Sequence, residues 1–214
     1  MKLSQGQQED GIVVGNTYDK YNSKNPIARK LVDGFSSALS ELVSIVSPDA
    51  IHEVGCGEGY WTLKWRAQGI AARGSDFSSI VIELARQNAA AQALDVEFKV
   101  SDIYDLEPAQ DAADLVVCCE VMEHLERPAE ALQILKRLAK PYLIVSVPRE
   151  PVWSWMNMAR GKYWSDWGNT PGHIQRWSKG TFLALLQQEV DVLEVRSPLP
   201  WTMALCRVRK DNDE

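Results

Sequence analysis

The chain alternates between short apolar runs and longer stretches in which hydrophobic residues recur at helical spacing. From Pro26 onward this spacing predicts a helix, which ends at Ser47-Pro48-Asp49. Five apolar runs and the helical stretches between them follow. The predicted strands are Ala50–Val54, Ile70–Ser75, Val96–Val100, Asp114–Cys119 and Tyr142–Val147, and the predicted helices are Tyr60–Gln68, Ser79–Gln92 and Arg127–Lys140.

The repeated order of strand, helix and strand predicts a parallel sheet that is covered on both faces. The run Leu115–Cys119 is apolar throughout, as is typical of a central parallel strand. After a helix predicted at Lys179–Gln188, the runs Val190–Arg196 and Trp201–Arg209 leave no room for a helix between them and predict an antiparallel pair. We therefore expect a Rossmann-like, doubly wound α/β fold with a seven-stranded sheet, mostly parallel with one antiparallel strand.

One domain over residues 1–214 suits this length. We expect an N-terminal arm and helix over 1–48, a central core over 49–147, an insertion over 148–178, and a C-terminal helix and strand pair over 179–214. Residues 1–15 are polar with several glycines and predict a mobile arm. The insertion has no clear period, and aromatic side chains there predict a lid or wall for a ligand, or a small core that anchors the loop. Its tryptophans are Trp153, Trp155, Trp164, Trp167 and Trp177.

The formal net charge of −6 argues against a chain built to hold a nucleic-acid backbone. No apolar run approaches the roughly 18–20 residues of a membrane span, and the N-terminus lacks the apolar core of a secretory signal. The four cysteines show no CxxC spacing, so no metal ligand is assigned, and a reducing cytoplasm is expected. Residues 16–30 and 149–179 each carry a charge of +3. This is either ordinary surface charge or a basic rim that suits an anionic ligand.

A glycine-rich loop follows the first predicted strand, in Ile51-His52-Glu53-Val54-Gly55-Cys56-Gly57-Glu58-Gly59. Its glycines let the backbone turn sharply and approach a ligand closely, although a glycine cluster can also be a simple turn. A dinucleotide-binding loop has the spacing G-x-G-x-x-G. Here Tyr60 occupies the position of the third glycine, which argues against a nicotinamide cofactor.

Acidic residues close the predicted strands in order. Asp76 ends the second strand, where it can accept both hydroxyls of a ribose, and Asp102 ends the third, where it can accept an adenine amino proton. Glu53 lies beside the glycine loop, and Cys119 and Glu120 end the fourth strand. Acids also cap helices and begin turns. The ordered set nevertheless favours a nucleoside-carrying cofactor, with Glu53 near the amino group of S-adenosylmethionine (SAM).

These residues lie in motifs that resemble the class I SAM-dependent methyltransferases, and the small-molecule ubiquinone-biosynthesis type in particular. The resemblance covers roughly residues 50–147, and implies the seven-stranded fold, SAM as methyl donor and a SAM-binding core over 49–147. The cofactor contacts that it implies are Glu53, Gly55, Gly57, Gly59, Asp76, Asp102 and Glu120, with Phe77 and Ile103 beside the two aspartates and with Cys56 and Cys119 contributing mainly backbone. The motifs are Glu53-Val-Gly-Cys-Gly-Glu-Gly, Ser75-Asp-Phe-Ser, Ser101-Asp-Ile and Asp114-Leu-Val-Val-Cys-Cys-Glu-Val-Met-Glu-His-Leu.

Two of the three histidines are candidates for catalysis. His173 lies near the end of the insertion, in the region where the resemblance places the acceptor pocket. A histidine that titrates near pH 7 suits a general base, although His173 can also simply cap or pack the turn. His124 follows the fourth strand and either orients the loop or faces the acceptor. His52 is interpreted as a packed strand residue. Tyr18 and Tyr21 precede the first helix and are predicted to close over the cofactor.

We therefore predict a cytoplasmic methyltransferase that acts at oxygen on a small acceptor that is anionic, or lipid- or sugar-like. The expected partner is this small-molecule acceptor. Transient contact with a membrane is compatible with a lipid-like acceptor, and binding of nucleic acid is not expected. Two alternatives stay open, namely an RNA or protein methyltransferase and a noncatalytic SAM-binding protein.

Overall fold

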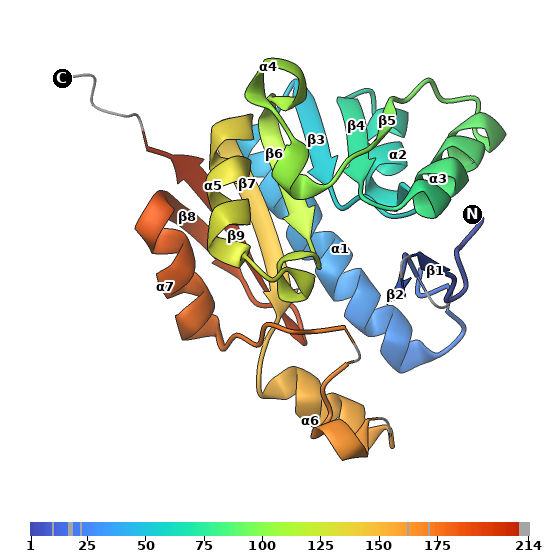
Figure 1. Ribbon diagram of the computed structural model, residues 1–214, viewed down its shortest axis with the longest axis vertical. Helices are drawn as coiled ribbons and strands as arrows, with labels where there is room; N and C mark the ends of the chain where they lie inside the picture. The colour runs from blue at the N-terminus through green and yellow to red at the C-terminus, as the bar shows by residue number, and fades with distance from the viewer. Residues whose placement is uncertain (10, 17–18, 22, 162, 171, 210–214) are drawn as a thin grey trace.

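A seven-stranded sheet lies at the centre of the computed structural model, with helices on both faces (Figure 1). The structure describes residues 1–209 except 10, 17, 18, 22, 162 and 171. The strand order is β5-β4-β3-β6-β7-β9-β8. Strand β9 runs antiparallel to both β7 and β8, while all other neighbours are parallel. The strands are β3 (Ala50–Val54), β4 (Ala71–Asp76), β5 (Phe98–Val100), β6 (Ala113–Cys119), β7 (Ala139–Pro148), β8 (Val190–Arg196) and β9 (Trp201–Val208).

This arrangement confirms the predicted fold class, including the single antiparallel strand. Every predicted strand and helix is present, and most bounds agree within two residues. Strand β7 begins at Ala139 rather than at Tyr142. The helices are α1 (Pro26–Val46), α2 (Tyr60–Ala67), α3 (Ser79–Ala91), α4 (Pro108–Asp111), α5 (Pro128–Leu138), α6 (Val152–Ala159) and α7 (Lys179–Glu189), with short 3₁₀ turns η1 (Ile103–Asp105), η2 (Met122–His124) and η3 (Trp164–Asp166).

The two faces of the sheet bury different helices. In β6, Leu115 and Val117 point into a cluster formed with α1 and α2, while Val116 and Cys118 point into one formed with α5 and α7. Successive side chains of a strand point to opposite faces, so an apolar strand of this kind needs helices on both sides. Among the described residues, no helix combines the length and the apolar character of a membrane span.

The N-terminal residues are docked on the body of the molecule, through contacts that the sequence did not predict for this arm. A short hairpin of β1 (Gln8–Glu9) and β2 (Ile12–Val13) lies beside α3 (Figure 1). The Glu58 carboxylate of the glycine loop accepts hydrogen bonds from the backbone of Ser4 (3.1 Å) and Asn16 (2.7 Å). The carboxylate of Glu9 accepts hydrogen bonds from the first turn of α3, where backbone N–H groups lack helical partners. These hydrogen bonds join the polar arm to the glycine loop and to α3.

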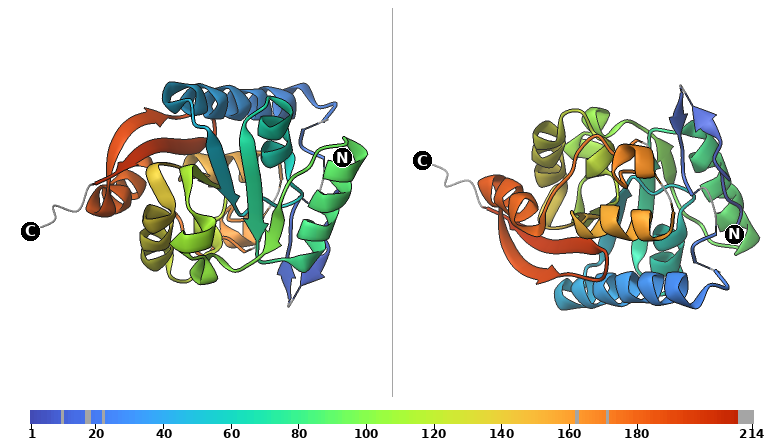
Figure 2. Two further views of the ribbon diagram at one scale, coloured as in Figure 1. Left: turned by 90° about the horizontal axis from the view of Figure 1, so that it is seen from above. Right: turned by 90° about the horizontal axis from the view of Figure 1, so that it is seen from below.

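The insertion contains regular structure that its sequence period did not predict. Helix α6 and the turn η3 leave the end of β7 and return to α7. In Figure 1 they lie beneath the sheet, and seen from below in Figure 2 they lie in front of it. The insertion therefore lies at the edge where the parallel strands end.

Candidate active site

The glycine loop turns sharply at the end of β3 and leaves open space above its middle. Gly55 has φ +77°, and a side chain there would overlap the Cγ2 methyl of Val121. Gly57 has φ +51°, and no described atom lies within 4 Å of the position that its Cβ would take. Both positions disfavour a side chain through their backbone conformation. Only at Gly57 is there also room for a ligand to approach the backbone.

Asp76 lies directly beside this open space, at the end of β4. Its carboxylate accepts hydrogen bonds from the backbone N–H of Gly57 (3.0 Å) and of Ser78 (3.0 Å). Burial raises the pKa of Asp76 to about 6, and the two hydrogen bonds oppose that shift. The ring of Phe77, 44% exposed, offers a flat apolar surface next to it. The loop and the second strand end therefore form one continuous polar and aromatic surface.

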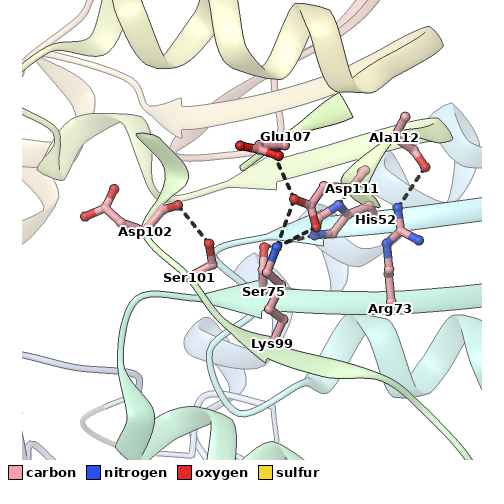
Figure 3. A network of polar contacts seen from close by, with 9 residues as sticks. All are labelled: His52, Arg73, Ser75, Lys99, Ser101, Asp102, Glu107, Asp111 and Ala112. Atoms are coloured by element: carbon pink, nitrogen blue, oxygen red, sulfur yellow. Dashed lines mark hydrogen bonds and ion pairs between the residues drawn. The ribbon is translucent and has the colours of Figure 1, made fainter. Parts of the chain in front are cut away.

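Asp102 and Ile103 follow β5. The exposed Asp102 side chain accepts a hydrogen bond from the backbone N–H of Tyr104 (3.0 Å) and so caps η1. The buried Ile103 anchors that turn in the core. In Figure 3 the Asp102 carboxylate points away from the neighbouring polar network, which leaves it accessible.

That network surrounds His52, which has the packed role expected of it. Its Nδ1 lies 2.7 Å from the carbonyl oxygen of Asp111, and its Nε2 lies 2.9 Å from the hydroxyl of Ser75 (Figure 3). Burial lowers the pKa of His52 to about 4, so the ring is neutral at pH 7. Both ring nitrogens are engaged, one by the last residue of α4 and one by β4, which supports the packed role of His52.

Glu53, the candidate for holding the cofactor amino group, is buried and already partnered. Its carboxylate accepts hydrogen bonds from the backbone N–H of Thr62 (2.8 Å) and from the hydroxyl of the same residue. Burial raises the pKa of Glu53 to about 8, against these bonds and against the charge of Lys20. In the structure Glu53 therefore links β3 to the first turn of α2.

Glu120 occupies the end of β6 in an unusual conformation. Its φ is +60°, a left-handed value that is uncommon for a residue with a side chain and that costs on the order of 1–3 kcal/mol. Its carboxylate accepts hydrogen bonds from the indole N–H of Trp201 and from the hydroxyl of Ser146 (3.3 Å). Burial raises its pKa, and the charge of Lys20 lowers it. The preceding residue, Cys119, is half-buried, and burial raises the pKa of its thiol.

A second group of side chains lies just beyond Glu120, and the structure brings both candidate catalytic histidines together there. The rings of His124 and His173 meet edge to face with centroids 4.8 Å apart. Glu123 joins them, and potential ligand atoms of the three residues lie within 4.8 Å of one another. No metal ligand is predicted from the sequence, and Glu123 is absent from the predicted site residues. The sequence could have pointed to Glu123, because this acidic residue directly precedes His124 and lies three residues after Glu120.

Both histidines have a pKa below the range near 7 that would suit a general base. Removal of the ring from water lowers the pKa of His173 to about 4, and the neighbouring His124 adds to that shift. Desolvation likewise lowers the pKa of His124. Burial raises the pKa of Glu123, and the charge of Glu120 adds to that shift. At pH 7 both rings are therefore neutral, and each is a weak base toward an additional proton.

The tryptophans of the insertion fall into two classes. Trp153 stacks on His173 at 5.7 Å and contacts Trp201, and Trp177 packs on Phe182 in the core. The other three side chains are exposed, at 69% for Trp155, 67% for Trp164 and 78% for Trp167. The N-terminal Tyr21 stacks on Tyr60 at 3.5 Å. Tyr18, predicted to close over the cofactor with Tyr21, lies outside the described residues.

Residues 51–142 match the family model of a methyltransferase domain. Together with the strand order, this match shows that residues 51–142 form a methyltransferase domain with the class I SAM-dependent fold. The matched segment runs from β3 into β7 and includes the ends of β3, β4, β5 and β6.

Two kinds of relatives resemble this methyltransferase domain. Among curated proteins, the ubiquinone biosynthesis O-methyltransferase of Actinobacillus pleuropneumoniae is 30% identical over 94 residues, which cover 42% of this chain and 40% of that protein. The enzyme of the same name from Alkalilimnicola ehrlichii is 27% identical over 149 residues, covering 63% of this chain and 60% of that protein. The chain thus spans about half the length of the curated relatives it matches.

Among solved structures, magnesium protoporphyrin IX methyltransferase from Synechocystis PCC 6803, with bound S-adenosylhomocysteine, aligns with a TM-score of 0.68 at 17% identity over 89% of this chain and 91% of that one. An N-methyltransferase from Bradyrhizobium japonicum aligns with a TM-score of 0.64 at 17% identity over 85% and 98%. At this identity the structural matches establish that the methyltransferase domain has the fold of these enzymes.

Proposed function

We propose that this chain is a SAM-dependent methyltransferase that methylates an oxygen atom of a small acceptor. The observation that carries the proposal is the open space above Gly57 beside the Asp76 carboxylate, at the strand ends of a domain that matches a methyltransferase model. Ligands of open α/β sheets bind in the crevice at these strand ends.

The residues present fit SAM. The crevice carries the carboxyl groups of Asp76 and Glu120, and a ligand with a cationic amino group and a cationic sulfur would favour their charged forms. The buried carboxyl group of Glu53 stays bonded to Thr62 at the start of α2. Asp76 and Asp102 would accept hydrogen bonds from the adenosyl part, and the exposed ring of Phe77 would stack on its base. When bound, SAM supplies a methyl group on a positively charged sulfur.

The work left to the chain is mainly to position the acceptor. Holding two reactants in line contributes up to roughly 7–11 kcal/mol toward the barrier in well-oriented cases. His124 and His173 stand at the acceptor end of the crevice beside Glu120, and their neutral rings can hold a hydroxyl group. A ring with a pKa near 4 accepts a proton weakly, so His173 serves better to orient the hydroxyl than to remove its proton at pH 7.

The acceptor class is inferred from side chains at the exit of β7 and in the insertion. Arg149, at the exit of β7, has a buried Nε to which no described residue offers an acceptor. It is a candidate to bind an anionic group of the acceptor. The exposed rings of Trp155, Trp164 and Trp167 supply apolar surface for a lipid- or sugar-like part.

The test is to incubate the chain with SAM that carries a labelled methyl group and with a metabolite extract, and to identify the labelled product. We expect S-adenosylhomocysteine together with a small O-methylated compound. Label in RNA or protein would identify one of those polymers as the acceptor instead. SAM binding without transfer to any fraction would indicate a noncatalytic SAM-binding protein. No SAM binding by calorimetry would overturn the proposal.

A further inference from the structure

Lys20, in the N-terminal arm, has an ammonium group with no anionic partner among the described residues. The side chain is half-buried, and none of the ion pairs between described residues includes its Nζ atom. The ammonium group lies over the ring of Tyr21, with Nζ 5.3 Å from the ring centroid. A cation over an aromatic face is stabilised by the ring and keeps its full charge. Lys20 is therefore able to pair with an anion that a ligand brings to it.

Aromatic contacts fix this part of the arm at the start of α2. Tyr21 stacks on Tyr60 with ring centroids 3.5 Å apart, and it meets Trp61 edge to face at 6.1 Å. Both geometries are favourable for pairs of aromatic rings. Tyr60 is the first residue of α2 and directly follows the glycine loop. The stack therefore holds the neighbouring Lys20 where the glycine loop ends.

The arm is also held upstream of Lys20, on the glycine loop itself. The backbone N–H and the side-chain amide of Asn16 donate to the Glu58 carboxylate, at 2.7 and 2.6 Å. A Cβ atom at Gly15 would overlap this carboxylate, so the arm passes directly against the loop. Glu58 is 1% exposed, and hydrogen bonds in such a shielded place are stronger than in water. The fold thus determines the position of Lys20 from both sides.

The charge of Lys20 acts on the ends of two neighbouring strands. It lowers the pKa of Glu53 near the end of β3 and of Glu120 directly after β6. Burial nevertheless raises the pKa of Glu53 to about 8, so this carboxyl group is mostly protonated at pH 7. Glu53 therefore does not neutralise the lysine. A positive charge stays available between the glycine loop and the end of β6.

The two parts of SAM require different positions along this edge of the sheet. In the proposed function, Asp76 and Asp102 bind the adenosyl part at the ends of β4 and β5. Strands β3 and β6 follow on the other side of β4, so the methionine part extends toward Glu120 and Lys20. That part carries an ammonium group and a carboxylate. The Glu120 carboxyl group suits the ammonium group, and the carboxylate needs a cationic donor.

We propose that Lys20 binds the carboxylate of the methionine part of SAM, so that the N-terminal arm completes the cofactor site. This inference rests on the proposed function. A hydrogen bond between an ammonium group and a carboxylate is stronger than one between neutral groups. An anionic group of the acceptor is the alternative ligand. The anchoring of the arm on Tyr60 and Glu58, beside the glycine loop, favours the cofactor.

The test compares two ligands by calorimetry on the full chain. S-adenosylhomocysteine carries both the amine and the carboxylate, and its decarboxylated analogue keeps only the amine. Lys20→Met retains an apolar stem over Tyr21 and should lower the affinity for S-adenosylhomocysteine by roughly 10-fold or more, the usual effect of removing a hydrogen bond between charged groups. It should leave the affinity for the analogue unchanged. Lys20→Arg keeps the charge and should retain most of the affinity for S-adenosylhomocysteine.

The control is Lys24→Met, which changes an exposed lysine of the same arm and should leave both affinities unchanged. Urea unfolding verifies that each variant is folded. Equal losses for both ligands in the folded Lys20→Met chain would overturn the inference, because the lysine would then act on the fold of the loop and not on a carboxylate.

Two further outcomes separate this inference from the proposed function. If Lys20→Met kept both affinities but raised KM for the acceptor, the lysine would bind an anionic group of the acceptor, and its assignment to SAM would be wrong. If the wild-type chain bound neither SAM nor S-adenosylhomocysteine, the proposed function itself would be overturned. Tight binding by the wild-type chain with equal affinities in every Lys20 variant would overturn only the role of Lys20.

Discussion

The two halves of the crevice differ in how their polar groups are satisfied. On the glycine-loop side, Glu53 and Asp76 accept hydrogen bonds from backbone N–H groups of their own half. On the side of the insertion, Glu123, Arg149 and Asn169 each have a buried polar atom with no hydrogen-bond partner among the described residues. In the first half, these two crevice carboxylates are already satisfied by the fold, and the buried unpartnered Nε of Arg73 belongs to the network around Asp111 and Ala112 instead. The second half contains groups whose partners a ligand would supply.

The aromatic residues differ in the same way. Trp61 and Trp65 of α2 are 5% and 3% exposed and pack in the core between α1 and the sheet. Trp164 and Trp167 of the insertion are largely exposed. Exposed aromatic surface beside unpartnered polar atoms is typical of a binding face. We infer that one half is built around a fixed cofactor and that the other determines which acceptor binds.

The largest effect is expected at the glycine loop, where two neighbouring glycines have different surroundings. Gly55→Ala adds a methyl group that overlaps Val121 at a left-handed φ, and should destabilise the fold by about 2–5 kcal/mol. Gly57→Ala meets open space and should lose only the conformational part, about 1–2 kcal/mol. Urea unfolding measures both.

The matched variant then tests the cofactor site. Gly57→Ala should abolish measurable SAM binding in calorimetry, because its methyl group occupies the open space that the ligand would use. A folded Gly57→Ala chain that binds SAM as tightly as the wild type would place the cofactor elsewhere.

The next largest effect is a loss of SAM affinity, expected from a change at the end of β4. Asp76→Ala removes the proposed acceptor of ribose hydroxyls and should lower SAM affinity by roughly 10- to 150-fold, since a hydrogen bond to a charged group contributes about 1.5–3 kcal/mol. Asp49→Ala is the control, because this exposed aspartate lies at the opposite end of the sheet, before β3. Equal SAM affinity in both variants would contradict the role of Asp76.

The sequence predicts the glycine-loop half better than the insertion half, for physical reasons. Strand period and chain order determine where β3, β4 and β5 end, so the amino-acid pattern alone places Asp76 and Asp102 at one edge of the sheet. The approach of His173 to His124 depends on hydrogen bonds from Ile174 and Gln175 to the backbone of Glu123, which no local pattern encodes. The docked N-terminus escaped prediction similarly, because the partners of Ser4 and Glu9 lie in distant segments.

A smaller effect is expected from the pH dependence of Glu53. Its carboxyl group ionises near pH 4.5 when exposed, but its pKa in the folded chain is about 8. Between these values the folded chain keeps a proton that the unfolded chain has lost, so Glu53 makes stability fall as the pH rises from about 4.5 to 8. The slope is at most about 1.4 kcal/mol per pH unit. Glu53→Gln keeps an acceptor for Thr62 and should remove this slope from urea-unfolding data collected across the range.

Glu97→Gln, an exposed carboxylate of the same half, should leave the slope unchanged. If Glu53→Gln retained the full slope, another group would be responsible, and Glu53 would be ionised in the folded chain.

The smallest effect on stability is expected at the exposed tryptophans, where the effect on function should be selective. Trp167→Ser should change the free energy of unfolding by no more than about 0.5 kcal/mol, because the side chain is 78% exposed. Trp61→Ala, in the buried half, should cost about 3–5 kcal/mol.

If Trp167 contacts the acceptor, its loss should raise KM for the acceptor. SAM affinity should not change, since the ring lies in the insertion and not in the glycine-loop half. Unchanged KM would assign the exposed ring to a surface other than the acceptor site, and a large loss of stability would show that the insertion half is as tightly packed as the other.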